Sequence, residues 1–382
     1  MQRKIVIVNQ ATGYLTIDIV NSFALHFDEV DLIYGGIRVQ DVPLHPKVRL
    51  RRVVKNSRVS HVRRFFAWII SSIQIFFLLL FKYRQHEIFY FSLPPFAYLG
   101  SLLLPNRFSL LMFDVYPDVL KMLNIRETHF VYKIWARWNK KLFAKAHRVY
   151  TIGGSLANLM AQYAPIEKIH VIPLWTGLAN ILPVPKKENS FIAEHGLQGK
   201  FIVQYSGNIA GTHNIESLLE VAKIMKAQKD ILFLIIGRGQ KMPLVTKTIK
   251  ENGLDNCMLL PFQPDNVIRY SIAAADLSVV LIEEKIAEVS IPSKLYNIMA
   301  VGSVVLSISP KNSEINKLVV KYNIGANFQH DEFRQMAEYI LKVKSSPELI
   351  RQYRANSIEA SKNYTATNAH KYIDVYLDAE KK

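Results

Sequence analysis

A lysine near the start of a predicted helix is the residue whose position points most directly to chemistry. Around the stretch 291–302, Ser290 can cap the helix, Pro292 is tolerated in its first turn and Gly302 can end it. Lys294 then lies in the first turn, where backbone amides carry partial positive charge and disfavour a cation. An anion held by both the lysine and the amides would resolve this conflict, which indicates a phosphate-type ligand. A surface lysine extending into water is the alternative.

Glycine and basic residues recur in other loops that directly follow predicted strands. Gly207 and Gly211 would let the backbone approach a phosphate closely, and Arg238 offers two parallel hydrogen bonds to one. A plain turn explains any single loop, whereas recurrence at successive strand ends indicates a nucleotide-type ligand. The sequence has no P-loop and no G-x-G-x-x-G motif opening a helix, which argues against an ATPase and a dehydrogenase.

The elements that would position these loops alternate between short apolar strands and helical segments. This alternation predicts an α/β protein with two tandem, doubly wound Rossmann-like domains, whose ligand-binding edges face across a cleft. We expect domains at 1–180 and 181–355, with a linker over 175–200 and a C-terminal helix in 356–382 packing back on the first domain. Strands are predicted at 4–9, 31–35, 48–54, 87–92, 108–113, 148–152, 170–172, 201–206, 232–236, 258–261, 277–282, 304–308 and 325–328, and first-domain helices at 16–26, 61–83, 95–104, 128–146 and 154–163.

Positive charge is concentrated in the first half of the chain. Residues 1–180 carry 23 Lys and Arg against 10 Asp and Glu, a net of +13, which leaves +4 of the total +17 for the rest. Ten basic residues and no acidic residue lie between Asp41 and Glu87. Such a segment is attracted to phosphate-rich surfaces, either nucleic acid or an anionic membrane. A single cysteine, Cys257, fits a reducing compartment, and the start of the chain does not resemble a signal peptide.

An uncharged run of 17 residues, 65–81, lies beside this basic segment. Three interpretations are open: a transmembrane helix, a helix buried in its domain, or a helix partly exposed at the bilayer interface. An aromatic and basic neighbourhood favours a membrane over nucleic acid, for which we find no binding motif. We therefore expect an anionic membrane surface as a partner, bound through residues 47–84.

The second half of the chain resembles the nucleotide-sugar domain of the family 4 retaining glycosyltransferases, which have the GT-B fold. The resemblance rests on 201–211, 237–239, 275–276 and 292–302, and the last of these is similar to the P-S-K-[LI]-Y-x-x-M-A-x-G signature of the capsule, O-antigen and exopolysaccharide branch. In the first half, 91–95 and 114–118 are similar to that branch's S-x-P-P and D-x-x-P-[DE] segments.

The resemblance implies site residues in both domains. Asn297 stands where many members have glutamate, Val289 stands where they have a second one, and Glu288 is one place off. Thr212, His213 and Asn214 replace a frequent basic pair. The implied donor-binding residues are Gly207, Asn208, Gly237, Arg238, Phe262, Ser293, Lys294 and Asn297; the implied acceptor-binding residues are Gly13 and Asp114; and the implied catalytic residues are Asp114 and Lys294.

The reaction implied is sugar transfer from a nucleoside-diphosphate sugar, a UDP-sugar, to a lipid-linked saccharide with retention, by a hexosyltransferase (EC 2.4) in surface polysaccharide biosynthesis. Fixed positive groups would stabilise the leaving diphosphate; with no Asp-x-Asp motif, we expect neither a metal nor another cofactor. Asp114 would orient or deprotonate the acceptor hydroxyl, or merely cap the turn at Pro117. We expect a cytoplasmic protein on the inner face of the plasma membrane. The alternatives are a non-catalytic scaffold subunit of a polysaccharide-assembly complex and, more remotely, a nucleic-acid binder.

Overall fold

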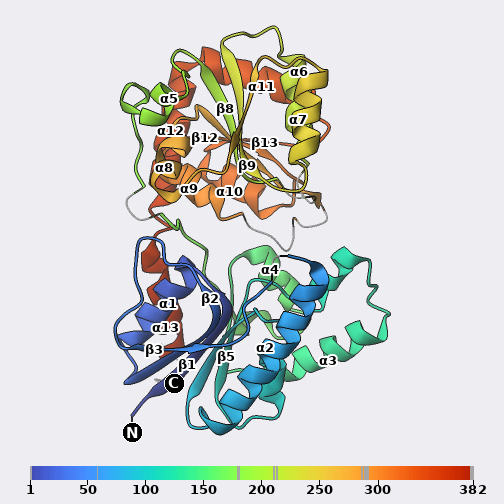
Figure 1. Cartoon of the computed structure of the whole chain (residues 1–382), viewed down its shortest axis with the longest axis vertical. Coiled ribbons are helices and arrows are strands. Elements are labelled where there is room, and N and C mark those ends of the chain that lie inside the picture. Colours follow the sequence, from blue (N-terminus) through green and yellow to red (C-terminus); the bar gives the residue numbers. More distant parts are fainter. Residues whose placement is uncertain are drawn as a thin grey trace. The chain divides into compact units, whose positions relative to one another are not determined.

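The chain forms two compact α/β units (Figure 1). The computed structural model describes residues 2–57, 59–178, 181–209, 211, 214–284, 287 and 292–378, and the side chains of residues 122 and 123 lie outside this description. One unit comprises Met1–Gly177 together with Ala366–Lys382, and the other comprises Leu178–Thr365. The predicted boundary at 355/356 falls inside helix α12, Pro347–Ser361, which belongs to the second unit.

The first unit contains one parallel sheet of seven strands in the order β3-β2-β1-β4-β5-β6-β7. Ile5, Val6, Ile7 and Val8 of the central strand are fully buried, as expected for a parallel strand covered on both faces. All seven strands correspond to predicted ones. Their bounds are β1 Lys4–Thr12, β2 Glu29–Ile37, β3 Val48–Arg52, β4 Glu87–Phe91, β5 Phe108–Met112, β6 Val149–Thr151 and β7 Ile169–Val171.

The helices of this unit follow the predicted pattern, with one difference. The segment predicted as a helix over 95–104 is a 3-10 helix, η1 (Ala97–Leu102). The serine before helix α2, Ser60, caps it by accepting a hydrogen bond of 3.2 Å from the Arg63 amide. The other helices are α1 Tyr14–Ala24, α2 His61–Phe81, η2 Asp118–Leu123, α3 Phe130–Lys145, α4 Gly154–Met160, η3 Ile166–Lys168, η6 Ala366–Ala369 and α13 His370–Asp378.

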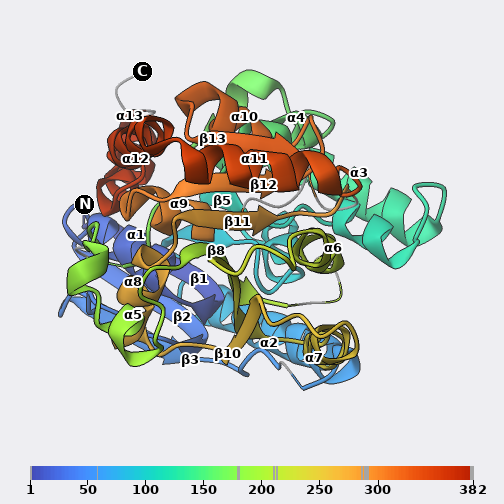
Figure 2. The ribbon, with the colours of Figure 1, turned by 90° about the horizontal axis from the view of Figure 1, so that it is seen from above.

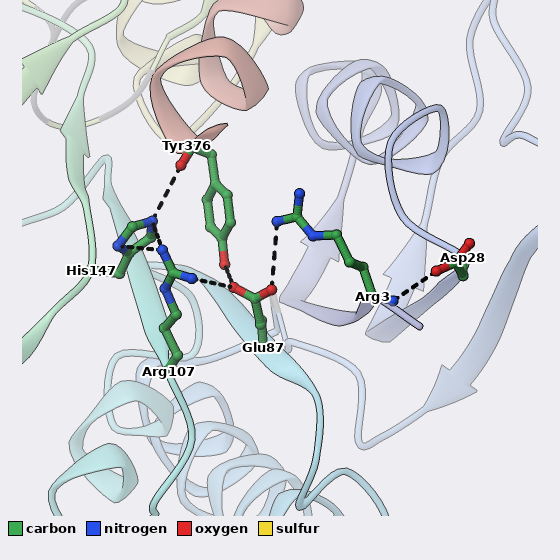
Figure 3. Close-up of polar contacts among 6 residues, drawn as sticks. All are labelled: Arg3, Asp28, Glu87, Arg107, His147 and Tyr376. Atoms are coloured by element: carbon green, nitrogen blue, oxygen red, sulfur yellow. Dashed lines mark hydrogen bonds and ion pairs between the residues drawn. The ribbon is translucent and has the colours of Figure 1, made fainter. Parts of the chain in front are cut away.

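The C-terminal helix α13 completes the first unit. The Tyr376 ring packs edge-on against Phe23, with centroids 5.4 Å apart, and its hydroxyl donates a hydrogen bond to the Glu87 carboxylate. Figure 3 shows this contact with Arg3 and Arg107 on either side of Glu87, each 3.6 Å from it. The helix therefore joins the core and the polar surface at the amino end of the sheet.

The second unit contains a parallel sheet of six strands in the order β10-β9-β8-β11-β12-β13. Alternate residues of β8 point to opposite faces: Val203 and Tyr205 join a core with α6, α7 and α11, whereas Ile202 joins one with α5 and α8. Figure 2 shows the helices on both sides of this sheet. The elements are η4 Lys186–Glu188, α5 Ser190–Glu194, β8 Phe201–Asn208, α6 Glu216–Ile224, β9 Ile231–Arg238, α7 Met242–Glu251, β10 Cys257–Pro261, α8 Asp265–Ala273, β11 Leu277–Leu281, α9 Lys294–Ala300, β12 Val304–Ile308, α10 Glu314–Tyr322, β13 Gly325–Phe328, α11 Phe333–Ser345 and α12.

The stretch 175–200, predicted to be a linker, is ordered at both ends. Trp175 is fully buried in the first unit, where its indole nitrogen donates a 2.8 Å hydrogen bond to Asp18. Lys186 of the second unit pairs with Asp276, and Phe191 lies in the core. The boundary between the units, 177/178, lies within this stretch as predicted, but the linker is shorter than predicted, because apolar anchors within the stretch pack into each unit.

Candidate functional site

A pocket lies at the carboxyl ends of the central strands of the second unit. Strand order reverses between β8 and β11, which is where open α/β sheets bind ligands. The pocket has a volume of about 180 Å³, room for only part of a nucleotide sugar. Five predicted donor-binding residues line it together: Gly207, Phe262, Ser293, Lys294 and Asn297.

Lys294 brings a cation into this pocket. Its ammonium nitrogen is buried, has no hydrogen-bond partner among the described residues and lies 4.1 Å from the centroid of the Tyr205 ring. Burial lowers the pKa of Lys294 to about 7, because the charged form is poorly solvated. An anion entering the pocket would supply the missing partner.

The helix that carries Lys294 begins later than predicted. Helix α9 starts at Lys294, with Ser293 at the N-cap position and no hydrogen bond from its side chain. The proposed cap, Ser290, lies outside the described residues, as do Glu288 and Val289. Gly302 follows the end of the helix with φ of +67°, a left-handed conformation that favours glycine, so the predicted terminator is confirmed.

A buried glutamine in the same pocket was missed by the sequence analysis. Gln204 is 2% exposed, and its Oε1 has no hydrogen-bond partner among the described residues. Ser206 and Ser278 line the pocket beside it. A polar residue inside the apolar run of β8 was the available signal, since burying an amide without partners is unfavourable.

Arg238 and Phe262 form a platform beside this pocket. The guanidinium carbon of Arg238 lies 4.9 Å from the centroid of the Phe262 ring, and Phe262 is 39% exposed. Both residues and Gly237 line a second, open cavity of about 570 Å³ beyond β9 and β10. Because Phe262 lines both cavities, the two adjoin, and each contains one basic residue: Lys294 in the first and Arg238 in the second.

The two glycines at the carboxyl edge of the second sheet, Gly207 and Gly237, have different structural roles. A Cβ on Gly237 would lie 2.0 Å from the Gly207 carbonyl oxygen, so the approach of β8 to β9 alone requires this glycine. Gly207 has φ of +151°, and its Cβ would lie 3.5 Å from the Lys294 nitrogen. Asn208 ends β8 next to Arg238 and lines neither cavity; its carbonyl accepts a 2.8 Å hydrogen bond from Tyr205.

The two proline motifs of the first unit meet at its carboxyl edge. The Ser92 hydroxyl accepts hydrogen bonds of 3.2 Å from the backbone amides of Phe113 and Asp114, which fixes the loop after β5. Asp114 is exposed at the surface, but the protein atoms around its carboxyl replace part of its water, and this desolvation raises the pKa of Asp114. No hydrogen bond from the Asp114 carboxylate is found among the described residues, so its interpretation as a cap for the Pro117 turn is wrong.

Asp118 is the structural aspartate of this motif. It is 4% exposed and accepts hydrogen bonds of 2.7 and 2.6 Å from the hydroxyls of Tyr132 and Tyr163. Lys121 adds an ion pair of 3.0 Å. These contacts tie η2 to α3 and to the segment after α4, leaving Asp114 as the aspartate available to a ligand.

Gly13 begins the helix that follows β1. It is the N-cap of α1 with φ of −129°, and a Cβ built on it would meet no atom within 4 Å. Neither backbone conformation nor packing therefore requires glycine here. The open space lies at the reversal of strand order between β1 and β4, where the first sheet would bind its ligand.

Three side chains that could together hold a metal lie at the opposite edge. Glu29, Asp31 and His86 place their ligand atoms within 4.8 Å of one another, the one such grouping in the described part of the chain. Lys4 lies 2.6 Å from Glu29, and Arg49 lies 2.6 Å from Asp31. Hydrogen bonds from Lys4 and Arg49 lower the pKa of Glu29 to about 2. The side chains of Lys4 and Arg49 therefore already neutralise these carboxylates.

Helix α2 is not buried in its domain. Val62, Phe66, Ile70, Ile73 and Phe77 form an exposed apolar stripe along it. The interpretation as a fully buried helix is wrong, because the inward face consists of Ala67, Ser71, Ser72, Ile75 and Leu79, which pack on the sheet side instead. By length and composition this is the one described helix that could cross a membrane, with a mean hydropathy of 1.9.

A solved structure with the same architecture has been determined with a bound nucleotide sugar. The chain is similar to the Anabaena protein Alr3699/HepE in complex with UDP-glucose, with a TM-score of 0.73 and 13% identity over 98% of this chain and 99% of that one. At this identity the likeness establishes the fold alone. The predicted pair of Rossmann-like domains of the GT-B fold is confirmed.

Two curated relatives show similarity at the level of sequence. A protein named as a probable glycosyltransferase, WbjE of Pseudomonas aeruginosa, is 27% identical over 58% of this chain and 56% of its own length. A glycosyl transferase named for colanic acid biosynthesis, WcaI of Escherichia coli (strain K12), is 25% identical over 44% of this chain and 42% of its own length. The chain therefore spans about half the length of the curated relatives it matches.

The second unit also matches a described family. Residues 187–362 match the family described as "Glycosyl transferases group 1", and this segment includes both cavities. The family match and the names of the relatives support the predicted enzyme class, a glycosyltransferase. By its sequence, the second unit is therefore similar to the group 1 glycosyl transferases.

Proposed function

We propose that the chain transfers a sugar from a nucleoside-diphosphate sugar, a UDP-sugar, to a lipid-linked saccharide with retention, in surface polysaccharide biosynthesis. The observation that carries this proposal is the buried ammonium of Lys294, which lies in a pocket at the strand-order reversal and has no hydrogen-bond partner in the part of the chain that the structure describes. The nucleotide sugar is supported by UDP-glucose in the HepE structure, and the polysaccharide by the name of WcaI.

The chemistry follows from where charge develops. When the bond between the sugar and the diphosphate breaks, negative charge grows on the leaving phosphate, and cations already in place stabilise it. Lys294 and Arg238 supply these cations, so we propose that no divalent metal is required. Phe262 and Asn297 line the pocket as partners for the base and ribose. Asp114 orients or deprotonates the acceptor hydroxyl, and the open space at Gly13 admits the acceptor.

The acceptor proposal places the protein at the cytoplasmic face of the plasma membrane. Residues 47–84 combine basic side chains with the exposed stripe of α2, which suits an anionic leaflet. A lipid-linked acceptor lies in such a leaflet, so one partner explains both features.

The test is transfer from labelled nucleotide sugars to bacterial membrane extract, with and without EDTA. We expect the wild type to consume one UDP-sugar in both conditions and Lys294→Ala to be inactive. Donor consumption by Lys294→Ala at the wild-type rate would refute the site, and loss of activity with EDTA would refute the metal-free mechanism.

The rival proposal is a non-catalytic scaffold, which the replacement of glutamate by Asn297 favours. It predicts that the affinity for nucleotide sugars is weak or absent, which calorimetry with UDP-glucose and UDP measures directly. Binding without turnover of any sugar donor would support a scaffold that has kept its ligand.

A further inference from the structure

A groove in the first unit lies between helices α2 and α3 and the 3-10 helix η1. It has a volume of about 630 Å³, within the range of 300–1,000 Å³ typical of ligand sites. Its walls are almost entirely apolar and include Ile73, Phe76, Phe77, Phe96, Leu103 and Trp138. Several of these side chains are open to solvent: Ile73 is 52%, Phe77 50%, Leu103 78% and Trp138 42% exposed. An apolar surface of this size needs an occupant.

Helix α2 presents its larger apolar side chains outward. On the inward face, Gln10 Nε2 donates hydrogen bonds of 3.2 Å to the Ala67 carbonyl and 2.9 Å to the Ser71 hydroxyl. A helix on the surface of a water-soluble domain normally buries its largest apolar residues and exposes polar ones. Along the groove, α2 instead exposes its largest apolar residues and buries small and polar ones. The exposed face of α2 therefore suits an apolar environment better than water.

Helix α3 contributes Trp138 to the groove and carries basic residues next to it. Phe130, Ile134 and Trp138 are exposed at intervals of four residues, so they share one face. The helix has no acidic residue and five basic ones, of which Arg137 and Lys141 adjoin Trp138. None of Lys133, Arg137, Lys140 and Lys141 has an acidic partner in the described part of the chain. A ligand of this groove is therefore apolar along its length and negative at one end.

A chain of aromatic ring contacts links the elements around the groove. Phe96 of the η1 segment lies 5.2 Å from Trp135 of α3, and Trp135 lies 5.2 Å from Tyr116, centroid to centroid. Trp68 of α2 closes the chain at 6.2 Å from Tyr116. Tyr116 belongs to the loop that carries Asp114, so the groove is connected to the proposed acceptor site.

We propose that this groove binds one hydrocarbon chain of an anionic membrane lipid, with the lipid phosphate against the basic residues of α3. Unlike adsorption of α2 to a bilayer surface, this requires α3 and a single inserted chain. The proposal deepens the lipid-linked acceptor proposed above, but the binding can be measured without any sugar donor. Failure of the lipid site and failure of the transfer reaction are therefore distinguishable.

The test uses brominated dodecyl phosphate as a monomer, below its critical micelle concentration, with tryptophan fluorescence as the readout. We expect saturable quenching in the full chain, loss of most of it in Trp138→Phe and no competition by inorganic phosphate. Replacing Arg137 and Lys141 by glutamine should weaken the binding severalfold. An absence of saturable quenching would overturn the proposal.

A matched pair of variants separates the groove from the general surface. Ile73→Asp and Ile70→Asp change the same side chain on the same helix at 52% and 46% exposure, but only Ile73 lines the groove. We expect Ile73→Asp to weaken binding about tenfold or more and Ile70→Asp about twofold or less. Equal weakening by both would show adsorption instead and refute the site. Leu103→Asp, at an exposed groove position, provides the same test if Ile73→Asp unfolds.

Discussion

The two units share one strand order and differ in the kind of side chain, polar or apolar, that they offer to a ligand. Each sheet runs 3-2-1-4-5-6 in its own strand numbering, and the first adds a seventh strand. At its carboxyl edge the second unit holds two buried polar atoms, Lys294 Nζ and Gln204 Oε1, that have no hydrogen-bond partner among the described residues. On the flank of its sheet the first unit exposes apolar side chains on α2 and α3. The same scaffold can therefore prepare one unit for a charged, soluble ligand and the other for an apolar one.

Removing the buried cation should have the largest effect. In Lys294→Met we expect transfer to fall by about 10²–10³-fold, because a preorganised charge opposite the leaving diphosphate is lost. The melting temperature of the free protein should not fall, since an unpaired buried charge no longer has to be desolvated. The stabilisation by UDP in a thermal shift assay should disappear. A variant that retains this stabilisation would place the diphosphate elsewhere.

Replacing Asp114 in the first unit should lower the rate of transfer without changing the affinity for the donor. We expect Asp114→Asn to lower kcat by about 10²-fold, as for loss of a positioned general base. UDP-glucose affinity measured by calorimetry should stay within about twofold of the wild type. Asp118→Asn is the control from the same motif; it should lower stability, because Asp118 anchors two tyrosines. A weaker donor affinity in Asp114→Asn would contradict the division of roles between the units.

The pH dependence should have opposite signs for binding and stability. Lys294 has a pKa of about 7 in the free protein and an ordinary value near 10.4 when unfolded. Between these values the unfolded chain binds more protons, so the Lys294 contribution to the free energy of unfolding rises with pH. Donor binding requires the protonated form, so UDP-glucose affinity should fall by up to about tenfold per pH unit above pH 7. Titration calorimetry from pH 6 to pH 9 measures this slope, and an affinity that stays constant over this range would contradict the role of Lys294.

Filling the open space at Gly13 should have a smaller, selective effect. We expect Gly13→Leu to raise KM for the acceptor several-fold, because nothing lies within 4 Å of its Cβ, and to lower the free energy of unfolding by only about 1 kcal/mol, because leucine is a poorer N-cap than glycine. Gly237→Ala is the contrasting variant; it should destabilise the second unit, since its Cβ would strike the Gly207 carbonyl. Unfolding in denaturant compares the two. A loss of stability in Gly13→Leu as large as in Gly237→Ala would mean that the space is not open.

Removing one hydroxyl at the C-terminal helix should have the smallest effect. Tyr376→Phe loses the hydrogen bond to Glu87 and leaves that carboxylate with its arginine partners. We expect a loss of about 1–2 kcal/mol in the free energy of unfolding, with donor binding unchanged. Tyr364→Phe, which removes a tyrosine hydroxyl in the second unit, is the control. A change in UDP-glucose affinity in Tyr376→Phe would contradict the independence of the donor site.

The strands were the most predictable part of the molecule. Apolar runs such as Ile5–Val8 are long, continuous and bounded by turns, so local pattern alone identified all thirteen. The exact start of α9 was not predictable, because the ends of helices are poorly defined by local sequence. The anchoring of Trp175 was not predictable, because it depends on a hydrogen bond to the distant Asp18. Lys294 was predictable as an anion site from its place in the sequence, whereas Gln204 required knowledge of which face of β8 it occupies.

The return of α13 to the first unit has a consequence for how the protein is made. The surface on which α13 packs, around Phe23 and Tyr150, has been synthesised completely by residue 177. The helix itself begins only at His370. At ordinary elongation rates of about 5–20 residues per second, that surface waits about 10–40 s on the ribosome while the whole second unit is translated. The nascent first half thus leaves the ribosome with an apolar gap that only the last helix closes.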